Sequence, residues 1–310
     1  MAAKTPAQVE VIRVDIARRK RLDLIFGICG ILALSIGLVT IAALFVEMAY
    51  DGWARFTPEF FTNFPSRRAT EAGILSAWVG SLLVMLTTAA VAIPLGVAAG
   101  VWLEEYAPKH WITDVIEINI NNLAGVPSIV YGLLALGLFV YTFHLGQTVR
   151  TAGLTLALLI LPMIIVATRE AIRSIPQIIR EGAYALGATK WQTVKDHILP
   201  YSMPGVLTGI IIGMSRAIGE TAPIITIGAL TFIAFLPPAP VSEVAPYINF
   251  DWLAAPFTVM PIQIFSWTSR PEAAFQLNAA AASAILVAMT LGMNGLAIWL
   301  RYHLRKNLKW

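Results

Sequence analysis

The sequence predicts an all-α polytopic protein that crosses a membrane six times. Of its 310 residues, 57% are hydrophobic and only 13% are charged, and the mean hydropathy is +0.72. A soluble domain carries about 25% charged residues, so this composition excludes an ordinary soluble enzyme. A bilayer core needs roughly 20 apolar residues per helix. The stretches that meet this requirement are about 22–49, 74–102, 119–142, 150–168, 203–233 and 278–301.

Lysine and arginine gather on one side of these predicted spans. Six lie in residues 1–21, one at Lys109, five in 169–200 and four from Arg301 onward, which makes 16, whereas the opposite side has five. Because basic residues accumulate in cytoplasmic loops, we expect both termini and residues 169–200 to be cytoplasmic. The net charge of +4 then fits contact with membrane lipid headgroups and argues against binding to nucleic acid.

We expect three parts along the chain. Residues 1–21 form a basic cytoplasmic tail, 22–73 hold the first transmembrane helix and an external loop, and 74–310 form a core domain with five transmembrane helices. The first apolar stretch exceeds the roughly 7 to 15 residues of a signal-peptide core, so we expect it to be retained. Within the core domain, a cytoplasmic loop should cover about 169–200 and an external loop about 234–277.

The external loop is rich in proline, which excludes one continuous helix. Its aromatic residues favour the membrane interface: Trp252, Phe257, Phe265 and Trp267. The loop is either a lid or receptor-facing surface, or a plain interfacial loop.

The entry to the third span, residues 121–128, reads NNLAGVPS and is unusually polar for a helix in a membrane. Its asparagine and serine side chains either cap a broken helix or face a wet cavity.

Residues 169–200 are semi-polar, helix-patterned and much longer than an ordinary loop between membrane helices. Pro176 predicts a break after the preceding helix, and Glu181 and Ala183 belong to a short helix beyond it. Gly187 supplies a turn that other residues resist, and a second helix follows, which Leu199 and Pro200 should end. This helix-turn-helix is either a docking element for the groove of a partner or an ordinary interfacial helix pair.

Arg216 and Glu220 are charged residues inside the fifth predicted span, where each charge costs at least ~2.5 kcal/mol on insertion scales. Being four residues apart, they share one helix face and can form an ion pair. Gly205, Gly209 and Gly213 form a stripe on nearly the same face, which permits close approach of another helix. We therefore expect the pair near a helix interface, where a transport path between two subunits would run.

The chemistry around Arg216 suits an oxyanion. Ser215, Thr221 and Thr226 add hydroxyl groups nearby, and an arginine with spare donors binds oxyanions better than cations or apolar solutes. The alternative is a structural salt bridge that joins two helices.

The cytoplasmic segment resembles the EAA loop that marks permease subunits of ATP-binding-cassette (ABC) importers. The residues at the loop's characteristic spacings are Glu181, Ala183, Gly187, Leu199 and Pro200. Gly182 and His197 depart from the usual alanine and isoleucine. The resemblance implies that the segment forms a coupling helix docked on an ATP-binding subunit.

Four further motifs together resemble the permeases of the bacterial high-affinity phosphate importer: NNLAGVPSIVYGLLALG, REGAYALGATKW, SRAIGETAP and FTVMPIQIFSWTSRP. The last one is closer to the A-type (PstA-type) subunit. This resemblance implies a type I ABC importer permease fold in the bacterial inner membrane that admits phosphate by alternating access. It also implies three partners: a homologous PstC-type permease, a PstB-type dimer of ATP-binding subunits and an external PstS-type phosphate-binding protein. Arg216 and Glu220 match the charged residues of the family's translocation path.

The chain has no P-loop, because no glycine in the sequence precedes a lysine. We therefore expect no catalytic residues, metal or cofactor in this chain, with ATP and Mg on the partner ATPase. The alternatives are a permease for sulfate or molybdate, an ion-coupled secondary carrier, and a scaffold subunit without a pathway.

Overall fold

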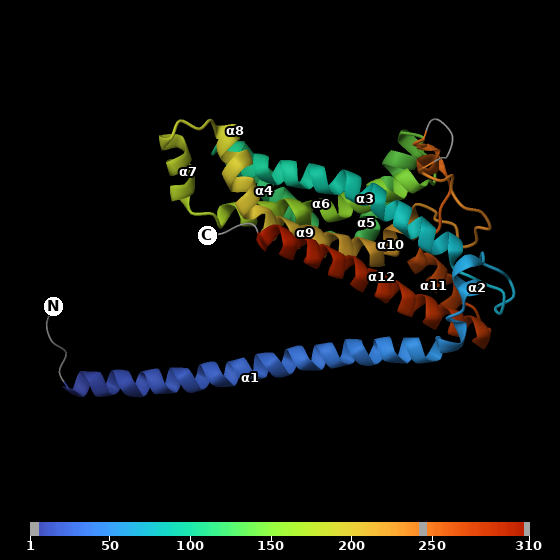
Figure 1. Ribbon diagram of the computed structural model, residues 1–310, viewed down its shortest axis with the longest axis horizontal. Helices are drawn as coiled ribbons and strands as arrows, with labels where there is room; N and C mark the ends of the chain where they lie inside the picture. The colour runs from blue at the N-terminus through green and yellow to red at the C-terminus, as the bar shows by residue number, and fades with distance from the viewer. Residues whose placement is uncertain (1–5, 242–246, 307–310) are drawn as a thin grey trace. The chain divides into compact units, whose positions relative to one another are not determined.

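The computed structural model describes residues 6–241 and 247–306, and the chain divides into two compact units, 1–51 and 52–310. The described part of the first unit is the single helix α1 (Pro6–Asp51), drawn in blue in Figure 1. Its stretch Arg18–Asp51 is long and apolar enough to cross a membrane and contains the first predicted span.

The second unit is built from helices. In chain order they are η1 (Trp53–Arg55), α2 (Pro58–Thr62), α3 (Leu75–Val101), η2 (Trp102–Tyr106), α4 (Trp111–Ala124), α5 (Ser128–Ala135), η3 (Leu136–Thr142), α6 (Val149–Arg173), α7 (Gln177–Ala185), α8 (Lys190–Thr193), η4 (Val194–Ile198), α9 (Leu199–Gly219), α10 (Ala222–Thr226), η5 (Asp251–Ala254), α11 (Met260–Thr268) and α12 (Ala273–Lys306). Figure 1 shows α7 and α8 at one end of this unit and α2 and α11 at the other.

The fold class predicted from the sequence is confirmed. Across the described residues, five helical stretches are long and apolar enough to span a membrane, and a bent pair brings the number to six. That pair is Trp111–Ala124 with Ser128–Thr142, bent by 105°. The bend lies in the polar stretch 121–128, as expected of a broken helix, and the Tyr131 hydroxyl donates a hydrogen bond of 2.8 Å across it to the Leu123 carbonyl. The predicted third span is therefore two helices that meet at an angle.

Helix α6 lies at the centre of the second unit, packed between α3 and α9. It is the most buried of the five candidate spans. Gly209 of α9 faces α6 so closely that a Cβ at this position would overlap the Ala167 side chain. Small residues thus let the two backbones approach, which is how helices associate where no hydrophobic driving force acts between them.

The predicted fifth span, 203–233, is wrong at both ends. Helix α9 ends at Gly219 because Pro223 has no N–H to donate to the Gly219 carbonyl and its ring would clash with that group. At the other end, Leu199 and Pro200 do not terminate the preceding element. They open α9 within one continuous helical stretch, Lys190–Gly219. A π-helical segment, η4, precedes them. Its wider turns let the chain stay helical although Pro200 has no N–H to donate.

The aromatic residues of the predicted external loop are mostly inside the protein. Trp252, Phe257 and Trp267 are at most 6% exposed, and only Phe265 is exposed. The expected interfacial position is therefore wrong for these three, because the loop folds back through η5 and α11 onto the core. Pro246 of this loop lies outside the described residues. The predicted division at residues 21 and 73 stays a prediction, although residues 52–73 pack within the second unit.

Candidate functional site

The break between α9 and α10 carries the two charged residues. Glu220 is the first residue after α9 and has extended backbone angles, φ −75° and ψ 122°. Arg216, in the last turn of α9, donates from Nε to Glu220 Oε1 at 3.2 Å, so the predicted ion pair is present. The side chains are 32% and 17% exposed, respectively. The sequence had suggested that the pair lies in the middle of a long helix. In the structure it lies at the end of a helix.

The Arg216 guanidinium has donors to spare. Its Nη1 lies 3.5 Å from the Sδ atom of Met163 in α6, a weak acceptor. Within the described part of the chain, its Nη2 makes no hydrogen bond with another residue. A partly exposed guanidinium with one carboxylate partner keeps the capacity to bind a second anion.

The three predicted hydroxyl residues lie in different surroundings. Ser215 bonds Asn294 of α12 and the Ile211 carbonyl, so it faces a neighbouring helix. Thr226 donates to the Pro223 carbonyl at 2.8 Å. Thr221 lines an open cavity of about 540 Å³ between α10, α11 and α12. Thr221, the residue after Glu220, is therefore the one of the three that borders this cavity.

The glycine stripe of α9 serves packing within the chain. Gly205 and Gly209 approach Ala171 and Ala167 of α6, and Gly213 lies beside Ile160. The helix that we expected to approach this stripe is therefore α6 of the same chain.

The coupling segment, by which we mean α7, α8 and the turn between them, has the predicted helix-turn-helix form. Gly187 follows the end of α7 with a φ of +84°, in the left-handed region. The Gly187 N–H donates to the Tyr184 carbonyl and the Ala188 N–H to the Ala183 carbonyl, which together make a Schellman motif. A capping box between Thr189 and Gln192 then starts α8.

Around this turn the surface is apolar and open. Glu181 is exposed and Ala183 is buried, while Leu199 and Pro200 are half-buried further along the helix. Four large side chains, which we call the docking surface, are 43–91% exposed: Ile178, Tyr184, Leu186 and Trp191. A cluster of exposed apolar side chains next to a polar helix is typical of a protein interaction site.

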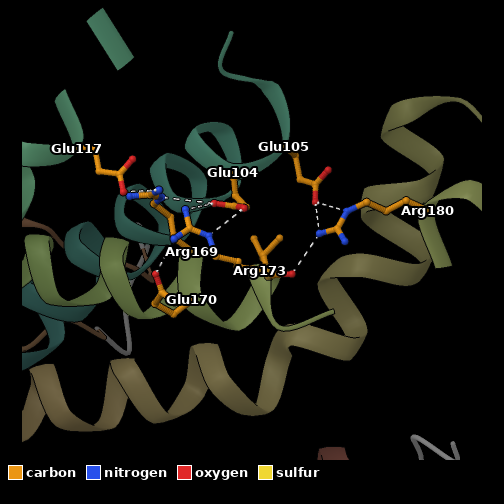
Figure 2. Close-up of polar contacts among 8 residues, drawn as sticks. Glu104, Glu105, Glu117, Arg169, Glu170, Arg173 and Arg180 are labelled. Carbon is orange, nitrogen blue, oxygen red and sulfur yellow. Dashed lines mark hydrogen bonds and ion pairs between the residues drawn. The ribbon is translucent and has the colours of Figure 1, made fainter. Parts of the chain in front are cut away.

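The sequence reasoning missed a set of ion pairs beside the coupling segment (Figure 2). Its carboxylates are Glu104 and Glu105 of η2, Glu117 of α4 and Glu170 of α6, and its arginines are Arg169, Arg173 and Arg180. A pair of glutamates at the end of one span, with arginines at the end of another, was the available sequence signal. In the described residues, no three His, Cys, Asp or Glu side chains are grouped to hold a metal ion.

Comparisons with known proteins identify the family. Residues 92–310 match the model of the binding-protein-dependent transport system inner membrane component. The chain belongs to this family. It is 32% identical to the probable ABC transporter permease protein YqgI of Bacillus subtilis, over 91% of this chain and 95% of the relative. It is 30% identical to the phosphate transport system permease protein PstA of Yersinia pestis, over 88% of this chain and 86% of that protein.

A structure of the MetNI methionine ABC transporter in an inward-facing conformation shares the fold. The TM-score is 0.56 at 16% identity, covering 74% of this chain and 95% of the other. Together these findings confirm the PstA-type resemblance and the type I importer fold. The chain is a multi-pass inner-membrane permease subunit of an ABC transporter, a class of subunit that is not itself catalytic.

Proposed function

We propose that this permease subunit moves inorganic phosphate into the cell by alternating access, driven by ATP hydrolysis on a partner. The observation that carries the proposal is the Arg216 guanidinium at the α9–α10 break, partly exposed and bonded to one carboxylate. A planar guanidinium with spare donors suits a tetrahedral oxyanion, and it offers nothing to a cation. The phosphate permeases among the relatives support phosphate within the oxyanion class.

The proposed assembly pairs this chain with a PstC-type permease, a PstB-type dimer that binds ATP and Mg, and a PstS-type binding protein. The open apolar docking surface, with Glu181 beside it, supports contact with the ATP-binding subunit. The distribution of lysine and arginine supports a cytoplasmic position for both termini and for the coupling segment.

The test is uptake of radiolabelled phosphate at matched membrane abundance. Arg216→Gln keeps bulk and some donors but removes the charge, so uptake should fall about tenfold or more. If the pair only joins helices, the double variant Arg216→Gln with Glu220→Gln should regain near-normal uptake, because neither charge is then left unpaired. Such a recovery would contradict the proposal. Arg68→Gln, which removes an exposed arginine, is the control.

Competition by unlabelled anions in the same uptake assay identifies which anion the transporter carries. Unlabelled phosphate should suppress the uptake, whereas equal concentrations of sulfate or molybdate should not. Suppression by sulfate or molybdate alone would assign the same site to that anion and reject phosphate.

A further inference from the structure

Arg180 in α7 joins three elements through one side chain. Its Nε and Nη2 donate to Glu105 Oε1 in η2 at 3.0 and 2.8 Å. Its Nη1 donates to the Ile175 carbonyl at 2.9 Å and its Nη2 to the Ile172 carbonyl at 3.1 Å, so it also satisfies backbone acceptors at the end of α6. The start of the coupling segment is thereby fixed to α6 and to η2 at once.

Arg169 in α6 forms a second junction. Its Nη2 lies 2.8 Å from Glu117 in α4, and its Nε lies 3.6 Å from Glu104 in η2. Arg173 shares Glu104 at 3.1 Å. Figure 2 shows that the adjacent glutamates pair with different arginines: Glu104 with Arg169 and Arg173, and Glu105 with Arg180.

The Arg180–Glu105 pair and the Arg169 side chain are shielded from water, whereas the Arg173 and Glu117 side chains are 49% and 33% exposed. The Arg180 and Glu105 side chains are 11% and 6% exposed, and that of Arg169 is 7% exposed. In contrast, the surface pair Arg68–Glu71 is 78% and 57% exposed. A buried ion pair adds little stability compared with apolar residues, but the loss of one partner strands a charge, so such a pair holds a defined geometry.

From α4 the contacts continue to the charged site. Helix α4 meets α5 at the 105° bend, where Tyr131 bonds the Leu123 carbonyl. Farther along α5, Gly132 lies against Pro223 in α10, just after Glu220. Ion pairs and close packing therefore form an unbroken series from the coupling segment to the α9–α10 break.

We propose that Arg180 and Arg169 are positioning residues. Arg180 holds the coupling segment to η2, and Arg169 joins η2 to α4 through α6, so that together they transmit movement of the coupling segment to the bent α4–α5 pair and to Glu220. This inference rests on the proposed coupling to an ATPase. Neither arginine belongs to the proposed phosphate site at Arg216. Arg180 fixes the orientation of α7 through its ion pair with Glu105. Arg169 fixes the position of α4 through its ion pair with Glu117.

The first test measures position and is independent of the substrate. Cys29→Ser first removes the one cysteine of the chain. Spin labels attached at Gln177→Cys in α7 and Lys109→Cys before α4 then report the distance between these two positions in the assembled transporter. Arg180→Gln should widen the distance distribution about twofold, because a stranded Glu105 no longer fixes α7. Glu105→Ala, which removes the acceptor in η2 but leaves the Arg180 hydrogen bonds to the Ile172 and Ile175 carbonyls, should widen it as well. Glu71→Gln, which breaks the exposed pair, should leave it unchanged.

The second test measures transport per ATP hydrolysed in proteoliposomes. Arg180→Gln and Arg169→Gln should each lower the phosphate moved per ATP about tenfold. An unchanged distance distribution in Arg180→Gln or in Glu105→Ala would overturn the inference. If the wild-type transporter hydrolyses ATP without moving phosphate, the proposed substrate is wrong, and the distance measurement still decides the positioning role.

Discussion

Gly132 of α5 lies directly against Pro223 in the first turn of α10: a Cβ at position 132 would come within 2.7 Å of the Pro223 Cα and overlap the Thr226 hydroxyl. The contact holds α5 to the segment that follows Glu220. Because only a hydrogen atom fits here, the geometry of the α9–α10 break depends on a residue 88 positions before Glu220 in the chain.

Gly132→Ala should therefore disturb this contact. Forcing a methyl group into a packed helix crossing costs about 1–3 kcal/mol, so the melting temperature of the solubilised protein should fall, and phosphate uptake with it. Gly137→Ala is the matched control, since a Cβ at position 137 meets no atom within 4 Å. Equal melting temperatures for the two variants would show that α5 and α10 are free to move apart.

Gly187 should be required for assembly with the ATP-binding subunit. Its φ of +84° costs a residue with a side chain about 1–2 kcal/mol, so Gly187→Val should misdirect α8 and the docking surface. Gly187→Trp should act in the same way. Co-purification of the ATPase should weaken while insertion into the membrane persists.

Gly187→Asn is the control for this prediction, because asparagine tolerates left-handed angles. It should retain more of the ATPase than Gly187→Val. Since a Cβ here would meet open space, an equal loss in both variants would indicate that the turn matters for a reason other than its backbone angles.

Arg216→Lys should also impair phosphate uptake. A compact ammonium keeps the charge but lacks the planar fork that binds an oxyanion through two parallel hydrogen bonds, so we expect a loss of about tenfold in uptake at low phosphate concentration. The measurement is the concentration dependence of uptake at matched abundance. Wild-type behaviour of this variant would mean that charge alone is sufficient at this position.

The distribution of basic residues predicts the side of each loop. In a Cys29→Ser background, Lys109→Cys should react with a membrane-impermeant thiol reagent only after the inner face is opened. Thr70→Cys should react from outside intact cells. Both positions are exposed, so the result depends on sidedness and not on burial. The reverse pattern would invert the predicted topology.

Features that depend on local chemistry could be predicted from the amino-acid sequence. Apolar stretches of bilayer length predicted the spans, and the orientation given by the bias of lysine and arginine stays a prediction. The polar residues of 121–128 indicated either a broken helix or a wet cavity, and the bend between α4 and α5 lies there. Glycine predicted the turn at Gly187, because its backbone freedom acts within a few residues. The four-residue spacing of Arg216 and Glu220 was enough to predict their ion pair.

Contacts between residues of distant segments depend on how the helices pack, and no local pattern predicts them. A proline restricts its neighbours, but whether it ends a helix depends on the surroundings: α9 ends before Pro223, whereas the helix continues through Pro200 after a π-helical segment. The ion pair of Arg180 with Glu105 joins residues 75 positions apart, and no local pattern specifies such a partner. Packing of α3, α4, α6 and α7 brings these charges together, because a buried charge must find its counter-charge wherever the fold supplies one.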